Sequence, residues 1–194
     1  KGRTAPGMFA VLANRYFQEF GYDRRTLAKV AVKNHYNGSL NDGAHFRKPI
    51  TEDQVLSAPM VADPLGLFDC SPTTDGAAAV ILTTTEIARR LKKDYVLIKG
   101  AGVASWGGYF SVQFRPDFDF LGFPSTRAAA AQAYRQAGIT DPRRQIDVVE
   151  CHDCFTITEL INYEDLGFCG RGEGGKLITE GVTTLEGGLP VNVS

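Results

Sequence analysis

Residues 146–167 read IDVVECHDCFTITELINYEDLG, a short strand-like stretch that passes into a helical pattern. Residues 146–150 are predicted to be a strand. Thr156 and Glu159 have the spacing of a capping box, and Gly167 is suited to end the helix that follows. The stretch therefore predicts a strand and a helix, with residues 152–155 between them.

The same alternation of strand and helix recurs along the chain. Further strands are expected at 77–82 and 95–103. Helices are expected at 8–20, from Asp23 toward Asn37, from Thr51 to Pro59, from Thr83 through Leu91, and from Ser125 to Gly138. Strands that alternate with helices indicate a parallel sheet with right-handed crossovers, and hence a layered α/β fold. A change in composition near 92–94 predicts a boundary between residues 1–93 and 94–194.

Composition excludes several classes of function. The 21 basic residues nearly balance the 22 acidic ones, which argues against a nucleic-acid-binding protein or one that binds anionic membranes. No apolar run reaches the roughly 18 residues of a membrane span. The four cysteines are unevenly spread, which favours reduced thiols in the cytoplasm over a disulfide framework.

The Cys151–Cys154 segment has the C-x-x-C pattern, for which several interpretations stay open. A zinc site would need a second ligand pair, which the sequence lacks, and a redox dithiol remains a minority alternative. Because ligands of parallel α/β sheets bind beyond the carboxyl ends of strands, His152 could donate to an oxyanion and Cys154 could act as a thiolate at the helix start. The competing interpretation is a core histidine beside an inert, buried cysteine.

Two other segments carry weaker signals. Residues 170–176 match the first seven positions of a phosphate-binding loop, but Leu177 stands where a Mg²⁺-binding hydroxyl is required, so a flexible glycine loop is expected. His35 and His45 lie in a polar stretch with Lys33 nearby. A solvated basic loop is expected there, and the alternative is a landing surface for a phosphorylated ligand.

Longer blocks of the sequence resemble a known family. These blocks are 32–35 (VKNH), 44–46 (AHF), 59–65 (PMVADPL), 69–79 (DCSPTTDGAAA), 152–161 (HDCFTITELI) and 164–169 (EDLGFC). In this order they resemble thiolases of the sterol-carrier-protein type, also called lipid-transfer-protein-like acetyl-CoA acetyltransferases. The resemblance implies a role in lipid metabolism or lipid transfer.

The family fold consists of two similar halves that stack into α/β/α/β/α layers, with a loop domain inserted in the first half. The resemblance implies that residues 1–93 are the end of the loop domain and the close of the first half, and that 94–194 begin the second half. The chain would then be the central part of a longer protein. The nucleophilic cysteine and its activating histidine would lie outside it, so the chain alone is expected to be inactive.

The family chemistry is Claisen condensation, or thiolytic cleavage of a 3-ketoacyl-CoA, through an acyl-cysteine intermediate. The resemblance implies that His152 stabilises an oxyanion and that Cys154 is an acid/base. It also implies that Ser71 and Phe155 line the tunnel for the pantetheine arm. Coenzyme A esters would be substrates, with no covalently bound cofactor and no metal.

Two alternatives to a thiolase are weighed against it. Thiolase-like steroid-CoA aldolases resemble this family but carry Tyr in place of His152, and they usually lack the catalytic cysteines. A non-catalytic thiolase-like subunit that binds an OB-fold partner is the second alternative. A homodimer or tetramer is expected for the complete protein.

Overall fold

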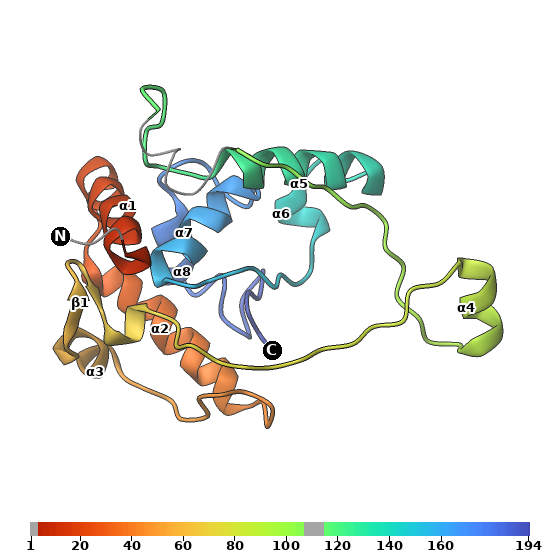
Figure 1. Cartoon of the computed structure of the whole chain (residues 1–194), viewed down its shortest axis with the longest axis horizontal. Helices are drawn as coiled ribbons and strands as arrows, with labels where there is room; N and C mark the ends of the chain where they lie inside the picture. The colour runs from red at the N-terminus through yellow and green to blue at the C-terminus, as the bar shows by residue number, and fades with distance from the viewer. Residues whose placement is uncertain (1–3, 107–114) are drawn as a thin grey trace.

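The computed structural model describes residues 4–106 and 115–194. The elements, in chain order, are α1 (Ala5–Phe20), α2 (Arg24–Ser39), α3 (Glu52–Ser57), β1 (Met60–Ala62), β2 (Leu65–Gly66), the 3₁₀ helix η1 (Leu67–Asp69), α4 (Thr85–Leu91), α5 (Pro124–Ala137), α6 (Pro142–Gln145), α7 (Thr156–Asp165) and α8 (Gly174–Thr179). Figure 1 shows α1, α2, α7 and α8 gathered in one body, with α4 at the end of a long arm.

The first two helices form as the sequence predicts. The side chain of Thr4 accepts from the Gly7 N–H at the start of α1, and Gly21 ends the helix in the left-handed conformation with φ 75°. Asp23 caps α2. Helix α2 continues through Ser39, past the turn that Asn37 was expected to begin, because the Asn37 side chain is buried and donates to the Asn192 carbonyl.

The main hydrophobic core joins the N-terminal helices to the C-terminal part of the chain. Its fully buried members include Tyr16, Leu27, Leu65, Ile157, Leu160, Ile161, Tyr163, Leu189 and Val191. They come from α1, α2, β2, α7 and the C-terminal segment. Residues before and after the expected boundary at 93/94 thus share one core, while the division into two thiolase halves stays a prediction.

A smaller cluster packs α3 against α2 through Val55, Ala28 and Ala31. Helix α3 has the capping box that the sequence predicts, with Thr51 and Gln54 bonded reciprocally. The proline-containing segment after α3 has some regular structure: β1 and β2 pair antiparallel, and η1 follows. This region leads directly to Cys70 and Ser71.

The strand predicted at 77–82 is not formed. Within residues 4–106 and 115–194 the only sheet is the β1–β2 pair. The side chains of Val80 and Ile81 are 80% and 89% exposed, because no described segment lies beside them to pair their backbone groups. Helix α4 follows on the same arm, with Thr84 rather than Thr83 as its cap.

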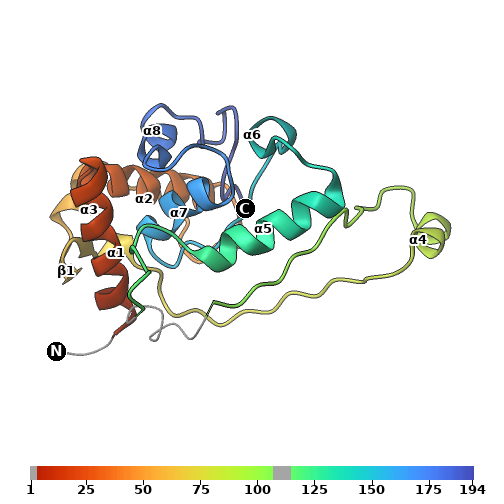
Figure 2. The same ribbon diagram turned by 90° about the horizontal axis from the view of Figure 1, so that it is seen from above.

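The strand predicted at 95–103 is also absent as a strand, yet its end has a defined neighbour. The Gln136 side chain of α5 accepts a hydrogen bond from the Ala101 N–H at 3.2 Å and donates one to the Ala101 carbonyl at 2.8 Å. A Cβ at Gly102 would lie 1.9 Å from the Ala129 carbonyl oxygen, so the segment can lie this close to α5 only with glycine there. Figure 2 shows the arm leaving the helical body beside α5.

Helix α5 ends at Gly138 as predicted, in the left-handed conformation with φ 73°. The predicted cap, Ser125, instead lies inside the first turn, which begins at Pro124. Asp165 of α7 holds this end of α5, since it accepts from the Phe123 N–H and pairs with Arg127, both at 2.5 Å.

The strand predicted at 146–150 forms only one isolated bridge. Val149 pairs in parallel with Val191: its N–H donates to the Pro190 carbonyl at 3.0 Å, and its own carbonyl accepts from the Asn192 N–H at 2.8 Å. The partner is the C-terminal segment and not one of the other predicted strands, and a single bridge makes no sheet. In the part of the chain that the structure describes, no helix has the length and hydropathy needed to cross a membrane.

Candidate functional site

The segment 151–155 lies between the Val149 bridge and helix α7, where the sequence placed a site. It is also joined to the end of η1, because Cys70 and Phe155 form an antiparallel bridge and the Ser71 N–H donates to the Cys154 carbonyl at 3.0 Å. Ser71 and Cys154, 83 positions apart in sequence, are thereby brought together. The fold thus assembles two of the blocks that resemble thiolases at one place.

His152 has an exposed side chain and a fixed backbone. Its carbonyl accepts a hydrogen bond from the Asn162 side chain of α7 at 2.9 Å. The interpretation of His152 as a core histidine is therefore wrong. An imidazole in this position is free to meet a ligand while its main chain is held.

Cys154 is half-buried beside the first turn of α7. Its Sγ lies 3.7 Å from the hydroxyl of Thr158. Burial raises the pKa of the Cys154 thiol and outweighs the hydrogen bonds from Thr158 and the Phe155 backbone, which lower it. The thiolate expected at the helix start is thus disfavoured in this structure, and the thiol is the resting form.

Cys151 is more deeply placed, and burial raises the pKa of its thiol to about 12. All four cysteines are free thiols. Among the described residues, no group of three or more His, Cys, Asp or Glu side chains is arranged to hold a metal ion. The role of the C-x-x-C pattern in redox chemistry stays a minority prediction.

The predicted capping box at the start of α7 is wrong. Phe155 is the N-cap residue, and the Thr156 hydroxyl donates to the buried carboxylate of Asp69 at 2.8 Å. Glu159 faces α2 instead, where it pairs with Lys33 at 2.8 Å. The capping-box pattern was misleading because both of its side chains have tertiary partners, which compete with local bonds.

Lys33 and Glu159 form a buried ion pair, with side chains 3% and 0% exposed. Lys33 was expected in a solvated basic loop, which is wrong: it lies in α2 and also donates to the Val191 carbonyl at 2.6 Å. Glu159 additionally accepts from Asn34, Asn192 and Tyr163. Because a buried carboxylate needs such partners to remain charged, this pair is a polar centre directly beneath the loop.

A cavity of about 660 Å³ opens beside the loop. Polar groups on its wall come from Asn34, His35, Ser71 and Asp153, and its apolar wall includes Phe46, Val61, Leu67 and Phe68. Burial raises the pKa of the Asp153 carboxyl and lowers that of His35, which stacks on Phe46. Of the two residues predicted to bind coenzyme A, Ser71 lines this cavity, whereas the Phe155 ring is buried and stacks on Phe9 at 4.5 Å.

Several polar residues of this site were missed by residue-level analysis. Asn34, Asp153 and Glu159 all belong to blocks that carry the family resemblance, but Asn34 and Asp153 had no predicted role and Glu159 was predicted only as part of a capping box. A signal was available in α2, where Thr26, Val30, Lys33 and Asn37 share one helical face with helical spacing. A lysine and an asparagine in helical register with Val30 indicate buried, partnered polar groups.

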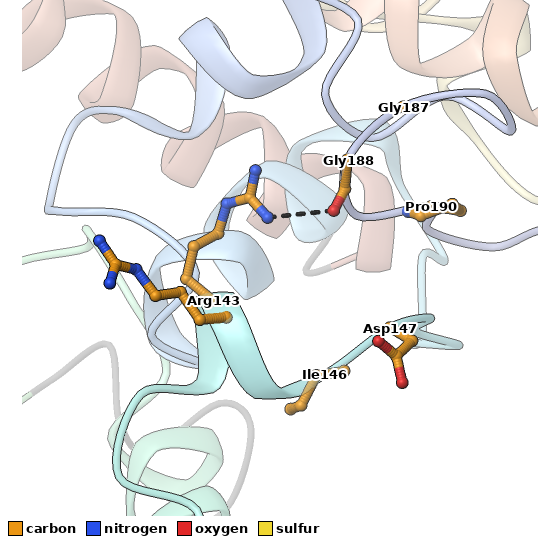
Figure 3. A pocket seen from close by; sticks show the side chains of 7 residues that line it. Arg143, Ile146, Asp147, Gly187, Gly188 and Pro190 are labelled. Carbon is orange, nitrogen blue, oxygen red and sulfur yellow. Dashed lines mark hydrogen bonds between the residues drawn. The ribbon is translucent and has the colours of Figure 1, made fainter.

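A second cavity, of about 690 Å³, lies between α6 and the C-terminal segment. Figure 3 shows Arg143 donating to the Gly188 carbonyl, at 3.2 Å, on one side of this cavity. The sequence pair Arg143–Arg144 is typical of exposed charges, and Arg144 is exposed. Arg143 instead has a backbone partner that ties α6 to residues 187–190. The glycine segment 170–176 is likewise partly ordered, because α8 begins at Gly174.

Comparison with known proteins agrees with this arrangement. Residues 4–86 match the family model described as "Thiolase, N-terminal domain", and residues 111–194 match "Thiolase C-terminal domain-like". The chain belongs to the thiolase family. The first match ends inside α4, at residue 86, and the second begins at residue 111.

This thiolase-family chain is 42% identical to the acetyl-CoA acetyltransferase of Methanothermobacter thermautotrophicus, over all of the chain and 49% of that protein. It is 33% identical to sterol carrier protein 2 of Bos taurus, over 98% of the chain and 35% of that protein. These relatives match the sterol-carrier-protein type that the sequence resembles.

The fold has a close counterpart among solved structures. The Ltp2-ChsH2(DUF35) aldolase superposes with a TM-score of 0.90 at 30% identity, over 99% of this chain and 50% of that one. The thiolase-like fold is therefore confirmed. The chain spans about half the length, or less, of the relatives named here.

Proposed function

We propose that the protein containing this chain is an acyl-CoA thiolase, which condenses acyl-CoA esters or cleaves 3-ketoacyl-CoA thiolytically. The observation that carries the proposal is the placement of an exposed His152 and a half-buried Cys154 in one loop whose backbone is bonded from two sides. A fixed donor and a nearby proton carrier are what enolate chemistry requires. The similarity to acetyl-CoA acetyltransferases supports the same conclusion.

In the proposed cleavage, a cysteine outside this chain adds to the 3-keto carbon, and the bond between C2 and C3 then breaks. The electrons of that bond form the enolate of acetyl-CoA, and the acyl group stays on the cysteine. His152 donates a hydrogen bond to the enolate oxygen, and Cys154 gives its proton to the α-carbon. Coenzyme A then accepts the acyl group, and Cys154 regains a proton. Condensation is the reverse.

The surroundings of Cys154 suit the acid half of this cycle. Because burial raises its pKa, the thiol is protonated at neutral pH and can protonate an enolate carbon. In condensation the same group must first lose its proton. The hydrogen bonds from Thr158 and the Phe155 backbone stabilise the thiolate and so assist that step.

The cavity beside the loop is the proposed place for the pantetheine arm of coenzyme A. Ser71 and Asn34 offer polar contacts, and Phe46 and Phe68 offer apolar surface, which suits a ligand that alternates amides with short alkyl chains. Phe155 would contribute indirectly, because its ring is buried in the core and stacks on Phe9. Both assignments of coenzyme A contacts, Ser71 and Phe155, remain part of the proposal.

The test is substitution of His152 in the gene product that contains this chain. If the imidazole stabilises an oxyanion, His152→Ala lowers kcat by about 10²- to 10³-fold and leaves coenzyme A affinity nearly unchanged. His152→Asn recovers part of the loss, because an amide can donate from the same place. The measurements are kcat, coenzyme A binding and melting temperature.

The control is His45→Ala, which removes another exposed histidine, one that is not among the residues lining the cavity. We expect kcat close to that of the unmodified protein. A loss of melting temperature without a loss of kcat in His152→Ala would contradict the proposed role. Equal losses of kcat in both variants would do the same.

An aldolase is the second candidate, favoured by the superposition on the Ltp2-ChsH2(DUF35) aldolase. That reaction would release an aldehyde or ketone from a coenzyme A ester and would need no acyl-cysteine. Iodoacetamide treatment separates the two: a thiolase loses activity when its nucleophilic cysteine is alkylated, and an aldolase without one keeps it.

The proposal includes an assembly and a compartment. A homodimer or tetramer, a cytoplasmic location and an OB-fold, acyl-CoA-binding partner are proposed for the complete protein. Free thiols suit a reducing compartment. The DUF35 component of the aldolase named above supports a partner protein. Sedimentation velocity of the gene product alone, and after purification from its natural source, measures both associations.

A further inference from the structure

Three asparagines from three parts of the fold bond to consecutive residues of the loop. The Asn192 side-chain oxygen accepts from the Cys151 N–H at 2.8 Å, Asn162 donates to the His152 carbonyl at 2.9 Å, and Asn34 donates to the Asp153 carboxylate at 2.7 Å. We call Asn34, Asn162 and Asn192 the asparagine clamp. They belong to α2, α7 and the C-terminal segment respectively.

Two members of the clamp share one carboxylate. Glu159 Oε2 accepts from Asn34 at 2.8 Å and from Asn192 at 2.9 Å, while its other oxygen pairs with Lys33. Each of these two asparagines therefore has one bond to Glu159 and one to the loop. A short side chain that is bonded at two places has little freedom to rotate. The position of Glu159 therefore helps to fix the position of the loop through these two asparagines.

Asn192 has a backbone conformation that few residues adopt. Its φ is 53°, in the left-handed region, where asparagine is among the most tolerated residues other than glycine. Lys33 and Asn37 bind the carbonyls of Val191 and Asn192 and keep this turn against α2. The turn thus presents the amide of Asn192 to both Cys151 and Glu159.

We propose that the asparagine clamp is a set of positioning residues that holds the backbone of Cys151 and His152 and the side chain of Asp153, so that the His152 imidazole meets the reacting oxygen. This inference rests on the proposed function. Asn162 and Asn192 act through the loop and need not touch substrate, whereas Asn34 also lines the cavity proposed for the pantetheine arm. Because hydrogen-bond donors stabilise a transition state only when they are aimed at it, a shift of about 1 Å is enough to lower turnover.

The test uses Asn192→Gly and Asn162→Ala in the gene product that contains this chain. Glycine accepts the positive φ of residue 192, so the first variant removes the amide without adding backbone strain. The second removes the bond to the His152 carbonyl. Asn14→Ala is the matched control, because Asn14 is also a helical asparagine that donates to two carbonyls, those of Ala10 and Asp63, away from the loop.

We expect each clamp variant to lower kcat by about 10- to 100-fold with little change in KM, and Asn14→Ala to leave both unchanged. A residue that acts through His152 has nothing left to position once the imidazole is gone. Asn192→Gly should therefore lower kcat by less than about threefold further in a His152→Ala background. A full additional loss in that background would overturn the proposal.

Hydrogen–deuterium exchange provides a readout that needs no activity. The Cys151 amide loses its acceptor in Asn192→Gly, so a peptide that covers 147–155 should exchange faster than in the unmodified protein or in Asn14→Ala. Unchanged exchange would overturn the clamp itself. Faster exchange with unchanged kcat would overturn its positioning role. An unmodified protein without thiolase activity would contradict the proposed function, and exchange alone would then decide whether the clamp exists.

Discussion

At the scale of single residues, the loop keeps two thiols of one C-x-x-C pattern in different surroundings. The half-buried Cys154 lies near a hydroxyl and the backbone amides at the start of α7. Cys151 is deeper and lies near the carboxylates of Glu159 and Asp153, which raise its pKa further. A pair of similar residues thereby acquires different reactivities from position alone.

The two thiols should therefore alkylate at different rates. We expect Cys154 to be labelled first as pH is raised, because the pKa of Cys151 is about 12 and its Sγ is less accessible. Iodoacetamide labelling at graded pH, followed by peptide mass spectrometry, measures both rates. Labelling in urea is the control, since unfolding should make the two rates nearly equal. Equal rates in the folded protein, or a reversible Cys151–Cys154 disulfide at cytosolic redox potential, would favour the oxidoreductase interpretation.

Asp69 makes the stability depend on pH in a specific direction. Burial raises its pKa above the ordinary value of 3.8, against the opposing hydrogen bonds from Gly66 and Thr156. The folded state therefore holds this proton more tightly than the unfolded chain does. Its contribution to stability is present below the unfolded pKa and is lost as pH rises through the raised, folded value.

Asp69→Asn should remove that loss. We expect the free energy of unfolding to fall less steeply with rising pH in the variant than in the unmodified protein, in the range above pH 3.8. Urea unfolding at a series of pH values measures the slope, which is independent of any constant cost of the substitution. Asp53→Asn, at an exposed aspartate of α3, is the control. Parallel pH profiles for Asp69→Asn and the unmodified protein would contradict the expectation.

At the scale of elements, α2 and α7 are joined by charge as well as by apolar packing. Lys33 lies among buried residues of α2, and Glu159 is the buried acid of α7 that it meets. Removing one partner of such a pair leaves the other charge in an apolar interior. The contact is therefore costly to break, even where a neutral replacement of both would be tolerated.

We expect Lys33→Met to lower the free energy of unfolding by about 3–5 kcal/mol, because Glu159 then loses its buried ionic partner. Adding Glu159→Gln to this variant should restore part of the loss. Arg15→Met is the matched control: it breaks an exposed i,i+4 pair with Glu19, at a cost of about 1 kcal/mol or less. Urea unfolding measures all three. Equal costs for Lys33→Met and Arg15→Met would contradict a buried, uncompensated charge.

The elements differ in how far sequence could predict them. Helix ends at Gly21 and Gly138 were predicted because a left-handed glycine is a local requirement. Strands at 77–82 and 95–103 were not formed, because a strand needs neighbours that periodicity cannot supply. A site between Val149 and α7 is a prediction from strand–helix order, and it stays a prediction together with the roles of His152, Cys154, Ser71 and Phe155.

What sequence could not provide is the set of distant partners. The spacing of Thr156 and Glu159 fits a local capping box equally well whether or not Asp69 and Lys33 are nearby. The asparagine clamp could not be predicted either, because no local pattern distinguishes Asn34, Asn162 and Asn192 in the sequence. Their meaning arises only when α2, α7 and the C-terminal segment come together.

At the scale of the whole molecule, the arm that carries α4 extends away from the helical body and contains exposed apolar residues (Figures 1 and 2). Val80, Ile81, Val96 and Ile98 are all at least 70% exposed. Apolar β-branched residues in an extended, unpaired backbone are prone to pair with another chain. The arm is therefore the part of this chain with the greatest tendency to associate.

We expect the 194-residue chain, produced by itself, to self-associate through the arm. Val80→Lys combined with Ile81→Lys should shift the chain toward the monomer, because charged side chains oppose edge pairing. Leu40→Lys, at an exposed apolar residue outside the arm, is the control and should have little effect. Sedimentation velocity over a range of concentrations measures the result. Monomeric behaviour of the unmodified chain, or an equal effect of both substitutions, would contradict this expectation.

The contacts between α2 and the C-terminal segment also set an order of events during synthesis. Lys33 and the Val191 carbonyl are 158 positions apart, so the ribosome must add almost all of these residues before the bond can form. Closing so long a loop late in folding is slow relative to forming local helices. The loop at 151–154 thus leaves the ribosome before Asn162 and Asn192, which help to hold it, and the site matures only when the C-terminal segment returns to the first helices made.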